Sequence, residues 1–316
     1  MQLDGTLKVV VNDTDVSKHI GDISWTNTKN TLATTMSFST PKPKEMKYMN
    51  IYIPQMGDIM RYSGGDKEDF RGVIIEVDDG AMYVNKYTAV DVGWYLNKTT
   101  DTYQFTSMRA DDCIKKICND LYIPIVLIPE LGTLITQIYI DKPVSDVIKD
   151  ILEKCGSGYN FDFVPDGMRI YLCRDIEAKP KFRISSNTEL KNSVQYMGNI
   201  EHKGSIENMK NSIKVITETD VMTTLKADES ISKYGFLQEV VKMNDGDNAA
   251  DLAKKNLGEL NKEDETYSGE IIEELASYTR AGSTIEKDGV KYVITSSQHS
   301  IKNGVHYNKI DMERLV

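Results

Sequence analysis

Two segments, Phe70-Arg-Gly-Val-Ile-Ile-Glu-Val-Asp78 and Tyr87-Thr-Ala-Val-Asp-Val-Gly93, decide the fold of this chain. The first is rich in β-branched and apolar residues and predicts a strand. Asp78-Asp-Gly80 then supplies residues that favour a turn. The second segment predicts another strand, which stops at Gly93. Together the two segments indicate a β-hairpin near the end of a β-rich stretch.

A similar pattern recurs at the other end of the chain. Gly289–Ser297 and Val305–Glu313 predict two strands, and Asn303-Gly304 between them favours a turn. Two hairpins therefore bracket a middle segment with helical patterns. This layout predicts two related β-domains in one subunit, which is more typical of tubes and rings than of an active site.

The composition indicates a folded protein with two or three domains. The chain has 316 residues, of which 40% are hydrophobic and 27% are charged. Its net charge of −10 provides no surplus of positive charge to hold phosphate backbones. We therefore expect no specific binding to nucleic acid.

The sequence carries no sign of export or of membrane insertion. Its first residues, Met1-Gln-Leu-Asp-Gly-Thr6, have neither a basic region nor an apolar run. No stretch approaches the roughly 18–20 apolar residues of a membrane-spanning helix. We expect synthesis in a host cytoplasm, and a reducing compartment in which the four cysteines form no disulfides.

Residues 1–98 predict an N-terminal β-domain. Apolar residues recur at every second position around Val9, Trp25 and Met36, which is typical of half-buried strands. Pro41-Lys-Pro43 and Gly64-Gly-Asp66 interrupt the pattern. Five or six short strands with such turns indicate a small barrel or sandwich.

Residues 99–178 predict a small α+β domain. Arg109–Leu121 and Lys142–Cys155 carry apolar residues at helical spacing. Tyr159–Phe163 and Met168–Leu172 predict a hairpin around Pro165-Asp-Gly167. We expect the apolar helix faces to be core, and name the following residues as buried: Cys113, Ile117, Leu121, Val147, Ile151 and Cys155.

Residues 179–316 predict a C-terminal β-domain with one inserted helix. A polar linker, Arg174–Lys181, precedes it. Ser212–Glu218 and Gly235–Val241 predict strands, and Asp247–Leu260 predicts the helix. The fold class is therefore α+β and mainly β, with two superposable β-barrel or sandwich domains and a small α+β domain between them.

No set of residues predicts a metal site or a nucleophile. Cys113 and Cys118 lie on the apolar face of one helix without the second pair that a zinc site needs, so buried and inert thiols are expected. His299 and His306 flank a turn, where histidines are commonly solvated. The other residues considered for a thiol–histidine site were Cys155, Cys173, His19 and His202.

Acidic pairs such as Glu273-Glu274 were interpreted as solvated faces or turns. The sequence contains no Gly-x-Ser-x-Gly elbow, no His-Glu-x-x-His helix and no phosphate-binding glycine loop. We therefore expect no enzyme activity, no cofactor and no catalytic, cofactor-binding or metal-binding residue.

Several segments, spread in order over nearly the whole chain, resemble the XkdQ/YqbQ proteins of phage-like contractile tails. They are Phe70-Arg-Gly-Val-Ile74, Tyr87–Lys98, Met108–Asp112, Tyr122-Ile-Pro124, Ser205–Val215, Lys233–Glu239 and Ser300–His306. The resemblance lies in strands and turns of a scaffold, because none of these segments is a catalytic signature.

The resemblance implies a structural baseplate hub subunit of a contractile phage tail or a tailocin, similar to late-control-D-type hub proteins. Two tube-type domains per subunit would give six in a homotrimeric ring, which adapts a sixfold tail tube to a threefold spike. The implied partners are the tail tube, a spike or hub-extension protein, baseplate wedge proteins and the tape measure protein. The implied location is the tail baseplate of the virion or tailocin particle.

Two other functions remain open from the sequence alone. The helix-then-hairpin order from Val144 to Leu172 also resembles small modules that bind cell walls. A tail-associated cell-wall hydrolase is the third possibility, although the chain reaches Val316 directly after the second predicted β-domain.

Overall fold

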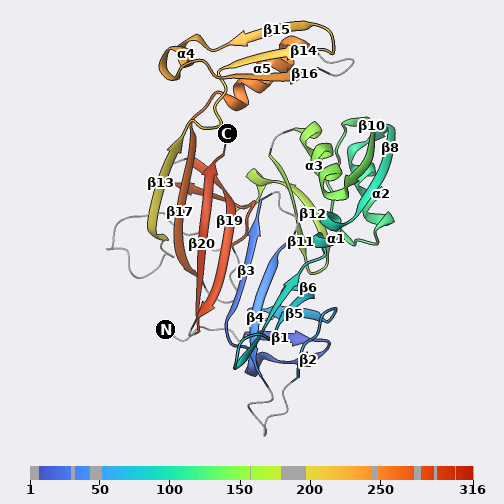
Figure 1. Cartoon of the computed structure of the whole chain (residues 1–316), viewed down its shortest axis with the longest axis vertical. Helices are drawn as coiled ribbons and strands as arrows, with labels where there is room; N and C mark the ends of the chain where they lie inside the picture. Colours follow the sequence, from blue (N-terminus) through green and yellow to red (C-terminus); the bar gives the residue numbers. More distant parts are fainter. Residues whose placement is uncertain are drawn as a thin grey trace. The chain divides into compact units, whose positions relative to one another are not determined.

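The computed structural model describes residues 7–29, 33–42, 52–156, 158–178, 197–243, 248–273, 279–287, 290–302 and 304–315. The chain forms two compact units (Figure 1). The main unit comprises Met1–Ile200 and Ser268–Val316, and the inserted unit comprises Glu201–Tyr267. The fold is α+β and mainly β, as predicted. The domain boundaries placed at residues 98 and 178 stay a prediction.

One large sheet dominates the fold, with the strand order β13-β17-β20-β19-β3-β4-β7-β6-β5-β1-β2 and with β18 beside β19. Its strands are β1 (Lys8–Val11), β2 (Thr14–Asp15), β3 (Ile23–Thr28), β4 (Thr35–Pro41), β5 (Ile59–Ser63), β6 (Glu68–Asp78), β7 (Val84–Val90), β13 (Met197–Ser205), β17 (Asp264–Glu273), β18 (Thr284–Lys287), β19 (Val290–Lys302) and β20 (Val305–Arg314).

Both predicted hairpins are present in this sheet. Strands β6 and β7 pair antiparallel, and so do β19 and β20. Strand β7 ends earlier than predicted, at Val90, because Gly93 already begins the short helix α1 (Gly93–Lys98). Strand β19 runs beyond the predicted end at Ser297, to Lys302. Asn303 of the predicted turn lies outside the described residues.

The two ends of the chain meet in this sheet. Strand β3 pairs antiparallel with β19, so that Trp25 lies opposite His299 and Ile23 lies opposite Ile301. Figure 1 shows the blue β3 beside the red β19. The N-terminal and C-terminal β-segments therefore share a continuous hydrogen-bonded ladder. Among the described residues, the strands do not close into a barrel.

The middle of the chain has its own apolar core, and both predicted helices are present as α2 (Ala110–Asp120) and α3 (Val144–Cys155). Cys113, Ile117, Val147 and Ile151 are fully buried, as predicted. Leu121 and Cys155 are only partly buried, because the first follows the end of α2 and the second is the last residue of α3.

The region around α2 and α3 also contains strands that the sequence did not predict. Strands β8 (Thr100–Arg109) and β10 (Leu134–Pro143) form a two-stranded antiparallel sheet. The predicted hairpin is present as β11 (Tyr159–Val164) and β12 (Gly167–Leu172), and β9 (Ile125–Leu127) pairs with β12.

Two 3-10 turns, η1 (Ser17–His19) and η3 (Cys173–Asp175), belong to the main unit. The second opens the predicted linker, whose residues 179–181 lie outside the described part of the chain. The linker is attached to the main unit, because the backbone N–H of Ala178 donates to the carbonyl oxygen of Thr284.

The inserted unit is a small sheet with a helix on one face. Its strands β14 (Ser212–Ile216), β15 (Val221–Lys226) and β16 (Gln238–Lys242) have the order β15-β14-β16. Helix α5 (Ala249–Leu260) covers the face that carries Ile213 and Val215, and its N-cap is Asn248. A further short helix, α4 (Asp228–Tyr234), was not predicted. In the described residues of both units, no helix is long and apolar enough to cross a membrane.

Candidate functional site at the Arg280 junction

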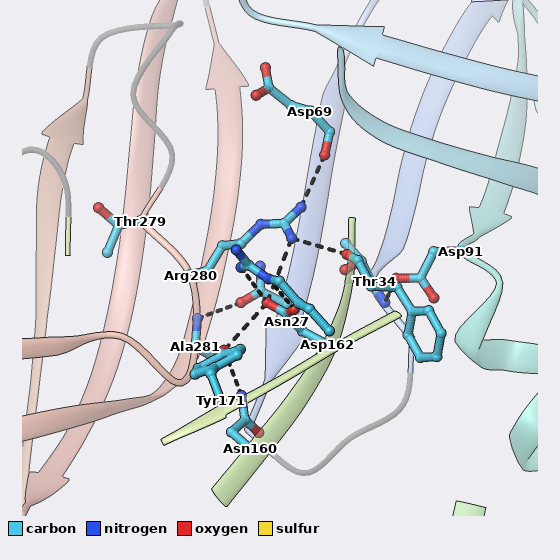
Figure 2. A network of polar contacts seen from close by, with 12 residues as sticks. Asn27, Thr34, Asp69, Asp91, Asn160, Asp162, Tyr171, Thr279, Arg280 and Ala281 are labelled. Carbon is cyan, nitrogen blue, oxygen red and sulfur yellow. Dashed lines mark hydrogen bonds and ion pairs between the residues drawn. The ribbon is translucent and has the colours of Figure 1, made fainter. Parts of the chain in front are cut away.

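The backbone turn at residues 279–282, which precedes β18, carries an arginine that reaches two other parts of the main unit. Arg280 donates from Nη1 to the carbonyl oxygen of Phe163 in β11, and from Nη2 to the carbonyl oxygen of Asp69 in β6. The donor–acceptor distance is 3.0 Å in both hydrogen bonds. Figure 2 shows the guanidinium between these segments. Because a guanidinium presents several donors in a rigid plane, one side chain fixes both strands at once.

Asp162 supplies the negative charge of this junction. Its carboxylate accepts two hydrogen bonds from Arg169, with donor–acceptor distances of 2.5 and 2.7 Å. The same carboxylate lies 3.8 Å from Nη1 of Arg280. The side chains of Arg280 and Asp162 are 13% and 18% exposed. Such partial burial strengthens the ion pair relative to one on the open surface.

The backbone of the turn is held as closely as the arginine. The N–H of Ala281 donates to Oδ1 of Asn27 over 2.7 Å. Gly282 has a φ of +87°, and a Cβ at this position would lie 2.3 Å from Nδ2 of Asn160 and 2.5 Å from the hydroxyl of Tyr171. Both its left-handed backbone and the lack of space require glycine here.

Asp91 anchors the neighbouring loop. It is buried and accepts hydrogen bonds from the backbone N–H groups of Thr34 and Gly93, over 2.7 and 2.9 Å. Burial raises the pKa of this carboxyl to about 6, against the lowering effect of the two N–H donors and of Arg280. Burial likewise raises the pKa of the Asp69 carboxyl.

A small cavity lies beside the junction, lined by Asn27, Asp91 and Arg280 among others. The centre of a water molecule can move within about 20 Å³ there, which is room for one or two waters rather than for a substrate or a cofactor. The junction is thus suited to fixing β3, β6, β11 and the 279–282 turn against one another (Figure 2).

The histidines beside the C-terminal turn are not where the sequence analysis placed them. His299 and His306 were expected to be solvated, but they are 1% and 0% exposed. Both side chains face the core because they alternate in phase with the buried Ile301 and Asn308 along β19 and β20. Glu273, interpreted as part of a solvated acidic pair, is also buried, at 1% exposed.

The other residues considered for a thiol–histidine site lie apart from these. Cys113, Cys118 and Cys173 are buried free thiols, and Cys155 is half-buried. Burial raises the pKa of Cys113 to about 11 and that of Cys118 to about 12, so neither forms a ready thiolate. His19 is half-buried in η1 and His202 is exposed.

The sequence analysis missed Arg280, Asn27 and Glu273. Nothing in the neighbouring residues of Arg280 or Asn27 signals their roles, because their partners come from distant segments. Glu273 did carry a signal, since it follows the buried Ile271 by two positions in a strand and therefore shares its face.

Comparison with known proteins decides the family. A family model described as YQBQ-like matches residues 23–313. The chain belongs to the YqbQ-like family. YqbQ of Bacillus subtilis (strain 168) is 29% identical over 276 residues, which are 83% of this chain and 82% of YqbQ. XkdQ of the phage-like element PBSX, from the same organism, is 26% identical over 278 residues, with the same shares.

The fold of this YqbQ-like chain is that of phage tail proteins. The 43 kDa tail protein of prophage MuSo2 from Shewanella oneidensis superposes with a TM-score of 0.73. The superposition covers 98% of this chain and 97% of the tail protein, at 9% sequence identity. The resemblance identified from scattered strand and turn segments is therefore confirmed at the level of the family and the fold.

Proposed function

We propose that this YqbQ-like chain is a structural baseplate hub subunit of a contractile phage tail or a tailocin. The observation that carries the proposal is the match of nearly the entire chain to the fold of a prophage tail protein. Membership in a family with XkdQ of a phage-like element supports the same assignment.

The proposed working form is a homotrimeric ring between the tail tube and the spike. Each subunit contributes two β-segments, residues 1–98 and 179–316, so that three subunits supply six tube-like elements to a sixfold tube. Strand edges of a sheet bind neighbouring chains unless something covers them, and closed rotational symmetry covers every such edge. The proposed partners are the tail tube protein, a spike or hub-extension protein, baseplate wedge proteins and the tape measure protein.

The Arg280 junction fits a structural role. Its arginine and the backbone of its turn hydrogen-bond to three other segments, β3, β6 and β11, and its cavity has room for one or two waters. A subunit that carries load between a tube and a spike benefits from such fixed contacts. We propose that the protein assembles in the host cytoplasm, acts in the baseplate of the particle and has no enzymatic activity.

An electron-microscopic reconstruction of the intact particle tests this function. We expect three copies of the chain at the hub, on the axis between tube and spike. Six copies at the hub, or a single copy at the periphery, would contradict the proposed ring. A clear zone from the purified chain in a peptidoglycan zymogram would contradict the absence of lytic activity.

A further inference from the structure

A cluster of six buried polar residues lies on one face of neighbouring strands in the main sheet. We call it the Glu273 cluster. Three of its side chains, Glu273, His299 and His306, come from β17, β19 and β20, which are adjacent in the strand order β17-β20-β19. The six residues are Glu273, Thr279, Ser297, His299, His306 and Asn308, all of them 0–1% exposed.

The possible ligand atoms of these three side chains converge. Nδ1 of His299 is 2.9 Å from Nε2 of His306 and 3.7 Å from Oε2 of Glu273. One ligand atom from each residue lies within 4.8 Å of the other two. Two ligands at about 2.0–2.1 Å from a tetrahedral zinc ion are roughly 3.3 Å apart. The histidine pair needs to open by only a few tenths of an ångström to reach that separation.

The proton on His299 is placed for metal binding. Its Nε2 atom lies 2.9 Å from the carbonyl oxygen of Thr279, which can only accept a hydrogen bond, and 2.7 Å from Oγ of Ser297, which donates its own hydrogen to Oδ1 of Asn308. Nε2 therefore carries the proton, and Nδ1 directs a lone pair toward His306 and Glu273. Metal-binding histidines usually have this arrangement, in which one ring nitrogen donates to a carbonyl oxygen and the other nitrogen faces the metal ion.

Glu273 adds a negative charge that its hydrogen-bonding partners do not neutralise. Its two partners, the N–H of Thr279 and Nδ2 of Asn308, are neutral donors at 3.4 and 3.2 Å. A buried carboxylate is costly unless a proton or a cation neutralises it.

We propose that Glu273, His299 and His306 bind a divalent transition-metal ion, for which zinc is the best-matched ion. Two imidazoles and one carboxylate form a ligand set that zinc accepts, and a water molecule takes the fourth position. On binding, the proton that Nε2 of His306 otherwise donates to His299 moves to Nδ1 of His306, so that a neutral imidazole offers its Nε2 lone pair to the ion, and any proton on Glu273 is released. The site is structural, because Trp25 stacks on His299 at a centroid distance of 4.6 Å and covers it from the β3 side.

This inference revises the sequence-based expectation of no metal site. That expectation depended on the spacing of the cysteines, and the histidines were considered only as partners of a thiol. The cysteines remain excluded, but the two histidines are buried and adjacent. The proposed ion cross-links three strands of the sheet and is independent of the hub assignment.

The test uses the full chain without a histidine tag, expressed with added zinc and purified without chelator. Elemental analysis should return about one zinc per chain for the wild type. The variant His306→Gln should lose the ion, and so should Glu273→Gln, which keeps an oxygen to accept the hydrogen bonds. The control His202→Gln removes an exposed histidine that stacks on Tyr267, and should keep the ion.

X-ray absorption of the wild-type protein gives a readout that does not depend on whether the variants fold. We expect nitrogen and oxygen neighbours with an imidazole signature. Sulfur in the coordination shell would overturn the proposal, because it would place the ion at a cysteine. The proposal would also be overturned by a wild-type chain without zinc, or by a folded His306→Gln variant that retains as much zinc as the control. In each case the cluster would hold protons and no metal ion.

Discussion

The backbone N–H of Ala281 donates to Oδ1 of Asn27 over 2.7 Å, although 254 positions separate the two residues. The hydrogen bond connects the end of β3 with the 279–282 turn, next to the contacts of Arg280. The turn is therefore a place where distant segments of the chain determine one another's position.

Replacing Arg280 with alanine should destabilise the main unit. The change leaves the carbonyl oxygens of Phe163 and Asp69 without their donor and removes a charge beside Asp162. We expect a loss of about 2–4 kcal/mol in the free energy of unfolding, measured by chemical denaturation. Arg174→Ala is the matched control, since this arginine is 69% exposed and should cost under about 0.5 kcal/mol. Equal losses would contradict the role of the junction.

Replacing Gly282 with alanine should cost more than its backbone conformation alone explains. The new Cβ would lie 2.3 Å from Nδ2 of Asn160 and would force the turn away from β11. Gly57→Ala is the control, because Gly57 has a φ of +91° and no atom within 4 Å of its Cβ position. We expect the Gly282 variant to lose about 1–3 kcal/mol beyond the control in denaturant. Similar losses for both variants would show that the turn tolerates a side chain.

Replacing Ile151 with alanine tests the core of the α2–α3 region. Ile151 is fully buried, and truncation should cost about 2–5 kcal/mol through lost burial and a residual cavity. The control is Ile140→Ala in β10, where the isoleucine is 68% exposed. Hydrogen exchange of α3 measures the change in stability. If Ile151→Ala lowers the stability by less than about 0.5 kcal/mol, residue 151 does not belong to the core.

Asp91 should make stability depend on pH in a defined direction. Its pKa is raised to about 6 in the folded protein from 3.8, so the folded state binds this proton more tightly than the unfolded state. Its contribution is therefore present below about pH 4 and is lost as the pH rises through about 6. Between pH 4 and pH 7, the free energy of unfolding of the wild type should therefore fall by about 2–3 kcal/mol relative to that of Asp91→Asn.

Denaturation of both proteins at the two pH values measures this difference directly. The comparison with Asp91→Asn cancels the titration of groups that the two proteins share. A difference that stays constant with pH would mean that the N–H donors of Thr34 and Gly93 balance the effect of burial, and one that grows in favour of the wild type would mean that they outweigh it.

Most local elements of the fold were predictable, because their signals lie within a few residues. The spacing of Val147 and Ile151 sufficed for α3, and the alternation around Val305–Glu313 sufficed for β20. Strand β10 escaped prediction, because Leu134, Ile138 and Ile140 are exposed and break the alternation of a half-buried strand.

The polar clusters were not predictable to the same degree. Arg280 acquires its role from Asp69 and Phe163, which lie far away in sequence, and the sequence gives no register between β3 and β19. His299 and Glu273 were within reach of strand periodicity, since each shares a face with a buried apolar neighbour two positions away. The expectation that these residues are solvated depended on a nearby turn, but the strand periodicity determines their burial.

The pairing of β3 with β19 sets the order in which a newly made chain can fold. At a synthesis rate of about 5–20 residues per second, the 254 positions from Asn27 to Ala281 take about 13–50 s to emerge from the ribosome. Strand β3 has β4 on one side, but its other edge stays open until β19 is made. A polypeptide that stops early keeps this open edge, which invites aggregation. Truncated copies are thereby excluded from completing the sheet, and only full-length subunits become available for assembly.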